Sequence, residues 1–173
     1  MSDRRLAREI VVQSLYEMAQ SGVAWKRALD ANVERREARP AAAEYAERLL
    51  REIDAKREEI SACVEQALTH WSLERLALVD RCVLEMAATE ILHFADVPTA
   101  VAIDEAVSIV HKFGAAESGA FVNGVLDRIA RDAAGTSGPT DGSLRATPSA
   151  AASTPSSGES KAPARRRRSG RRD

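Results

Sequence analysis

Three arginines near the start of the chain are the residues whose type and spacing best suit a chemical role. Arg4, Arg5 and Arg8 fall on one side of a helix, because each residue turns an α-helix by about 100°. On a helical wheel this stripe lies beside the apolar face. Guanidinium groups in such a place can hold phosphates or stack on unpaired bases. The alternative is an ordinary solvated basic face.

Catalytic and metal-binding chemistry finds little support in the sequence. His70, His93 and His111 are far apart and give no ligand spacing such as HExxH. Asp104 and Glu105 are adjacent, so on a helix their carboxylates point about 100° apart. The sequence contains none of the motifs GxSxG, GxxxxGK[ST] and GxGxxG. We therefore expect a binding protein that has no catalytic residues, no metal and no cofactor.

The formal net charge of −1 conceals an uneven distribution of charge. Residues 135–173 carry eight basic and three acidic side chains, whereas residues 1–134 carry 17 basic and 23 acidic ones. The overall field of the first part therefore does not attract nucleic acid, and an RNA site on it must be a local patch. The terminal run RRRRSGRR either adds nonspecific RNA affinity or only keeps the chain in solution.

The elements that must position these residues are predicted to be helices. The chain is 45% hydrophobic but only 4% aromatic, and its abundant Ala, Leu, Glu and Arg favour helix over sheet. Apolar residues recur at spacings of three and four, which predicts an all-α fold of about seven helices. The expected ranges are about 3–20, 24–37, 41–53, 54–69, 73–94, 99–112 and 117–134. Ser72 is the expected cap of the fifth helix and Thr99 of the sixth.

The domain organisation follows from a change in composition near residue 135. Residues 1–134 form one helical domain, with halves of about 1–70 and 71–134 that meet near Trp71. Residues 135–173 are rich in Ser, Pro and Ala, which predicts a disordered tail with a basic end. The sequence contains no run of about 18 apolar residues, so we expect no membrane span. We also expect no secretory signal, because the N-terminus has no apolar stretch of the kind that such signals need. With only two cysteines, the cytoplasm is the simplest location.

An ordered series of short motifs resembles the NusB family. Each piece is weak alone, but together they span about residues 3–130 in the order in which the family has them. They are Arg4-Arg5-x-Ala7-Arg8-Glu9-x-x-x-Gln13-x-Leu15-Tyr16, Asp80-Arg81-x-x-Leu84 with Ala87 and Glu90, Asp96-Val97-Pro98, Val101-Ala102-Ile103-Asp104-Glu105-Ala106-Val107, Lys112-Phe113-Gly114, Ser118, and Phe121-Val122-Asn123-Gly124-Val125-Leu126-Asp127.

The resemblance implies a fold and a function. The fold would be two perpendicular three-helix bundles that share a long helix, without a cofactor. The function would be to bind boxA-type single-stranded RNA together with ribosomal protein NusE. That heterodimer would join RNA polymerase with NusA and NusG, and would promote transcription antitermination, notably on ribosomal RNA operons.

The resemblance also implies site residues, by position. RNA would be bound by Arg4, Arg5 and Arg8, with Glu117, Ser118 and Phe121 near the RNA, whereas Tyr16 and Asp80 would face NusE. An alternative is a NusB-like module that binds proteins but has little RNA affinity of its own. An rRNA methyltransferase with a NusB-like domain fits poorly, because this chain lacks a large α/β cofactor domain. The resemblance also allows a homodimer, since some family members dimerise.

Overall fold

The computed structural model describes residues 2–69 and 71–135. These residues form seven α-helices and one short 3-10 helix, and no strand occurs among them. The α-helices are α1 (Asp3–Ser21), α2 (Trp25–Arg35), α3 (Pro40–Ala55), α4 (Arg57–Ala67), α5 (Leu78–His93), α6 (Thr99–Phe113) and α7 (Ser118–Ala133), and the 3-10 helix is Leu73–Arg75. The prediction of an all-helical fold with about seven helices is confirmed.

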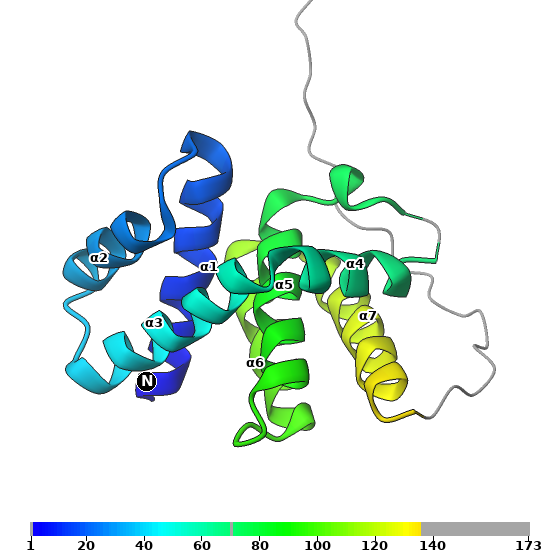
Figure 1. Ribbon diagram of the computed structural model, residues 1–173. Helices are drawn as coiled ribbons and strands as arrows, with labels where there is room; N and C mark the ends of the chain where they lie inside the picture. Colours follow the sequence, from blue (N-terminus) through cyan, green and yellow to red (C-terminus); the bar gives the residue numbers. More distant parts are fainter. Residues whose placement is uncertain (1, 70, 136–173) are drawn as a thin grey trace, which may run out of the picture.

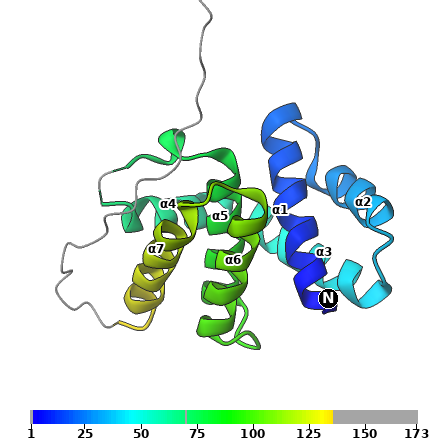
Figure 2. The same ribbon diagram turned by 180° about the vertical axis from the view of Figure 1, so that it is seen from behind.

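The helices form two groups that meet at α5 (Figure 1). Helix α1 packs against α2 and α3, whereas α4, α6 and α7 pack against α5. Contacts of α1 and α3 with α5 join the groups. In Figure 2, seen from behind, α6 lies in front of α5, with α7 on one side of it and α1 and α2 on the other. Because α5 has neighbours on several sides, it buries ten of its 16 residues.

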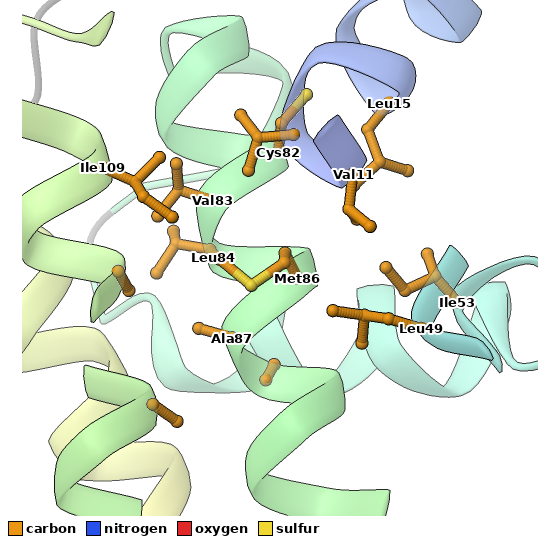
Figure 3. Packing of buried hydrophobic residues seen from close by; sticks show 14 of the residues in the cluster. Val11, Leu15, Leu49, Ile53, Cys82, Val83, Leu84, Met86, Ala87 and Ile109 are labelled. Atoms are coloured by element: carbon orange, nitrogen blue, oxygen red, sulfur yellow. The ribbon is translucent and has the colours of Figure 1, made fainter. Parts of the chain in front are cut away.

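The hydrophobic core is continuous across both groups. Figure 3 shows Val11 of α1 and Leu49 of α3 directed toward Met86 of α5, while Val83 and Ile109 meet on the other side of α5. Leu49, Met86 and Ile109 are fully buried. Burying one such side chain contributes roughly 1.5–3 kcal/mol to stability. The apolar residues of α5 therefore hold the two groups in a fixed relation to each other.

Local signals explain where several helices begin and end. The Ser2 side chain accepts a hydrogen bond from the Arg5 backbone N–H at 3.2 Å, which caps α1. Gly22 ends α1 in the left-handed conformation at φ 68°, which glycine adopts without steric cost. Pro40 is the first residue of α3, where its missing N–H costs nothing.

The start of the fifth helix differs from the prediction. The segment from Leu73 to Arg75 is a separate 3-10 turn, and α5 begins only at Leu78. Leu76 and Ala77 are extended, with ψ of 147° and 135°, so the chain straightens between the two helical pieces. The Ser72 side chain makes no capping hydrogen bond. Leu76 is nevertheless buried, which explains why its apolar spacing resembled that of a helix.

The N-terminal end of α1 lies near the connection between α5 and α6. Both are at the lower end of the molecule in Figures 1 and 2. An ion pair between Arg4 and Asp96 joins them at 2.7 Å. Residues 136–173, almost all of the predicted disordered tail, lie outside the described residues. Among the helices that are described, none combines the length and apolar character needed to cross a membrane.

Candidate nucleic-acid and partner interface

Arg4 is accessible at the start of α1. Its side chain is 48% exposed, and its guanidinium pairs with the Asp96 carboxylate at 2.7 Å. The same guanidinium lies 5.0 Å from the centre of the Tyr45 ring. Arg4 is therefore a half-exposed cation that two neighbours hold in place, and it stands where a ligand from solvent can reach it.

Arg5 lies next to Arg4 on a surface with more acidic neighbours. Its side chain is one-third exposed, at 33%. Its Nε is 4.0 Å from a Glu9 oxygen, and its Nη1 is 3.8 Å from a Glu105 oxygen. Both separations are too long for good hydrogen bonds. Arg5 therefore keeps N–H groups that could donate hydrogen bonds to an incoming phosphate.

Arg8 does not lie on the surface with Arg4 and Arg5. Its side chain is only 3% exposed, and its Nε donates to both carboxylate oxygens of Glu90 at 2.9 Å. The hydroxyl of Tyr45 donates to the same carboxylate. Burial, together with the hydrogen bond to Glu90, raises the pKa of Tyr45. The expectation of three guanidinium groups displayed together is therefore wrong for Arg8, because α1 packs this side chain against α5.

Glu9 organises the basic side chains beside Arg5. Its carboxylate is buried, and one oxygen accepts hydrogen bonds from Lys112 at 2.7 Å and from Arg36 at 2.8 Å. Burial alone would raise the pKa of Glu9, but the hydrogen bonds and positive charges of Lys112 and Arg36 together outweigh burial and lower it. One anion therefore joins residues of α1 and α6 to Arg36, which follows α2.

Asp80 is buried instead of facing solvent. One of its oxygens accepts a hydrogen bond from the Ser118 hydroxyl at 2.8 Å, and the other has no hydrogen-bond partner among the described residues. Burial raises the pKa of Asp80, and the Ser118 hydrogen bond offsets this only in part. A Cβ on Gly114 would lie 3.1 Å from Asp80 Oδ1, so the segment between α6 and α7 closes tightly over the carboxylate.

Of the three predicted site residues at the start of α7, only one is exposed to solvent. Glu117 is exposed, whereas Ser118 and Phe121 are buried. The Phe121 ring belongs to the hydrophobic core, so it cannot stack on an RNA base in this conformation. The sequence did not reveal this, because the start of α7 is apolar enough to suit either role.

Tyr16 is exposed and borders a groove. Its side chain is one of two large hydrophobic ones that are exposed among the described residues. The groove has a volume of about 350 Å³. It is lined by Val12, Gln13, Tyr16, Glu17, Arg35, Val79 and Phe113. Val79 and Phe113 adjoin Asp80 and Gly114 in sequence, so the groove runs from α1 to the closed segment beside Asp80.

Several residues that contact these arginines or lie beside them could not be found from the sequence. Glu90, Tyr45 and Arg48 are far from α1 in the chain, and only the packing of α1, α3 and α5 brings them beside Arg4 or Arg8. The sequence alone gives Asp96 and Glu90 only as members of motifs. Among the described residues, no group of three or more His, Cys, Asp or Glu side chains could hold a metal ion. Cys63 and Cys82 are free thiols.

Comparisons with known proteins agree with this arrangement of helices. The family model described as "NusB family" matches residues 5–131. The Transcription antitermination protein NusB of Salinibacter ruber is 40% identical over 133 residues, which cover 76% of this chain and 83% of that protein.

Solved structures show the same fold. The T. maritima NusB structure has a TM-score of 0.71 at 36% identity, and the match covers 75% of this chain and 91% of that one. A crystal structure of antitermination factors NusB and NusE in complex with dsRNA matches with a TM-score of 0.71 at 28% identity, over 76% and 98% of the two chains. The match to this family confirms the expectation of a non-enzymatic factor. The sequence, the helical architecture and these similarities show that the chain belongs to the NusB family.

Proposed function

We propose that this protein is a transcription antitermination factor that binds boxA-type single-stranded RNA together with ribosomal protein NusE. Two findings support the proposal. A relative with 40% identity is named a transcription antitermination protein. A structural neighbour was solved with NusE and double-stranded RNA. In the proposed role, the RNA–protein complex joins RNA polymerase with NusA and NusG in the cytoplasm, notably on ribosomal RNA operons.

The observation that carries the proposal is the relation between Arg5 and Tyr16 on α1. They are eleven residues apart, which is about three full helical turns, so both lie on the same side of the helix. The rise of a helix separates them by about 17 Å along its axis. One helix can therefore present a cationic site at its start and an aromatic contact beside a groove, to two ligands at once.

The proposed site residues divide into contacting and supporting ones. Arg4 and Arg5 contact RNA phosphates, and Tyr16 contacts NusE at the groove. Asp80 and Ser118 act through the segment that carries Glu117, because their hydrogen bond fixes the start of α7. Arg8 and Phe121 are buried, so they support the RNA surface from inside the protein.

The alternative is a NusB-like module that binds NusE but has little RNA affinity of its own. One observation favours it: Arg4 is already paired with a carboxylate, and Arg5 lies near two. Any RNA phosphate must compete with these carboxylates. The proposal predicts that NusE increases the RNA affinity of the protein, whereas the alternative predicts that NusE binds without such a gain.

The test is a titration of fluorescently labelled boxA RNA with the full chain, with and without purified NusE. We expect tighter binding with NusE, and a preference for single-stranded boxA over a scrambled single strand and over a duplex. Binding of NusE without any gain in RNA affinity would favour the alternative. The oligomeric state, measured by sedimentation before each titration, shows whether a homodimer competes with NusE.

A further inference from the structure

Arg4 and Arg48 converge on a single carboxylate. Arg4 Nη2 lies 2.7 Å from Asp96 Oδ2, and Arg48 Nη2 lies 2.8 Å from Asp96 Oδ1. The three residues come from α1, α3 and the connection between α5 and α6. Each of the three side chains is roughly half exposed. Two cations and one anion therefore meet at the surface and leave one positive charge in excess.

Two buried aromatic rings support the arginines from beneath. The Arg48 guanidinium lies 4.3 Å from the centre of the Phe94 ring, and Tyr45 lies within 5.4 Å of both guanidinium groups. Phe94 and Tyr45 pack edge to face with centres 5.9 Å apart. Planar guanidinium groups over aromatic rings are weakly hydrated and lose little freedom when they bind a ligand. The pair is therefore prepared to hold an anion.

The Asp96 carboxylate shows what shape of ligand fits between the arginines. It accepts one hydrogen bond on each oxygen, as the two free oxygens of a phosphodiester would. The hydrogen bond from Arg48, followed by that from Arg4, lowers the pKa of Asp96, so the carboxylate is charged at neutral pH. Because it is exposed, its contacts with the arginines are replaceable by those of an incoming anion.

We propose that Arg48 is a further RNA-binding residue of this protein, and that Arg4 and Arg48 together bind one phosphodiester group of RNA in place of Asp96. The inference rests on the proposed function, and extends the RNA surface from α1 to α3. Asp96 holds the two arginines in position without RNA and competes with the phosphate. The occupant is RNA and not an acidic protein, because the adjacent Arg5 makes only long contacts with Glu9 and Glu105 and could hold a second phosphate of the same strand.

The test compares Arg48→Gln with Arg57→Gln in the full chain. Arg57 is a matched control, since it is 45% exposed and pairs with Asp54 at 2.9 Å. Among the described residues, however, Asp54 pairs with no second arginine, and no aromatic ring lies against the Arg57 guanidinium. Glutamine keeps part of the side-chain stem over Phe94, which protects the fold. Binding of boxA RNA in the presence of NusE is measured at several salt concentrations.

We expect Arg48→Gln to lower the slope of log affinity against log salt by about 0.7, as the loss of one phosphate contact would. Its RNA affinity should fall roughly three- to tenfold. Arg57→Gln should match the wild type. Asp96→Asn should bind RNA more tightly than the wild type, whereas Asp54→Asn should not.

Equal salt slopes for Arg48→Gln and Arg57→Gln would overturn the inference, whether both are unchanged or both are reduced. A loss of NusE binding by Arg48→Gln with an unchanged RNA slope would assign the pair to a protein partner and would also overturn it. In each of these cases the wild type still binds RNA, so the proposed function stands. A wild type that binds no RNA in any condition would overturn both.

Discussion

Arg8 of α1 and Glu90 of α5 form a buried ion pair in which one guanidinium nitrogen donates to both carboxylate oxygens at 2.9 Å. The pair joins the two groups of helices near the point where α1 meets α5. Tyr45 of α3 completes it through its hydroxyl. A residue that the spacing of arginines predicted as an RNA ligand is thus part of the internal framework.

Removing one member of this pair should strongly destabilise the protein. We expect Arg8→Met to lower the free energy of unfolding by about 3–5 kcal/mol, because it leaves the Glu90 carboxylate buried without its cation. Pairing it with Glu90→Leu should recover much of the loss, since neither charge of this pair then remains buried. Urea unfolding measures both, with Arg57→Met as the exposed control. A loss below about 0.5 kcal/mol for Arg8→Met, a typical surface value, would show that the pair is not structural.

The burial of the Asp80 carboxyl group should make stability depend on pH. Burial raises the folded-state pKa of Asp80 above its unfolded value, so the folded protein binds this proton more readily. Stability from this group therefore rises as the pH falls from neutral through the folded pKa, and levels off below the unfolded pKa of about 3.9. We expect this increment in the wild type but not in Asp80→Asn. Chemical unfolding at a series of pH values gives the difference between the two proteins.

Equal pH dependence of wild type and Asp80→Asn would contradict a raised pKa at Asp80. Glu9 does not affect the difference in pH dependence between the wild type and Asp80→Asn. Its folded pKa is lowered, so its contribution is present above its unfolded pKa and is lost only as the pH falls through the folded value. It is also common to both proteins.

A substitution at Gly114 tests how tightly the segment after α6 packs against Val110 and Asp80. In Gly114→Ala the new Cβ would lie 2.8 Å from the Val110 carbonyl oxygen, which is backbone and cannot move alone. We expect a loss of about 1–3 kcal/mol. In Gly119→Ala the close neighbour is the His111 ring, a side chain at the surface that can rotate away. Thermal unfolding should therefore rank Gly114→Ala as the more damaging, and the reverse order would contradict the described packing.

Local sequence signals predicted most of the fold, because the helices here begin and end at residues with clear chemistry. The expected helix limits at residues 20 and 41 lie close to Gly22, which ends α1, and Pro40, which begins α3. The fifth helix was placed too early, since the apolar spacing of Leu73 and Leu76 is also satisfied by a 3-10 turn and an extended segment. The spacing of apolar residues indicates which side chains are buried. It does not fix the backbone, because more than one backbone conformation can bury Leu73 and Leu76.

The candidate site was less predictable, because it depends on contacts between residues far apart in the chain. The helical wheel placed Arg8 beside the apolar face, but only the approach of α5 shows that Glu90 lies there to receive it. Likewise, nothing near Arg48 in the sequence indicates that Asp96 and Phe94 will surround it. The sequence also does not show that Phe121 is buried in the hydrophobic core and not available to RNA.

RNA binding at the start of α1 is the central claim, and one titration tests it most directly. The double variant Arg4→Gln, Arg5→Gln is compared with the wild type for binding of single-stranded boxA RNA with NusE present, from low to high salt. We predict a slope of log affinity against log salt that is smaller by about 0.7 for each arginine, with NusE binding unchanged. An unchanged slope and affinity in the double variant would contradict the account.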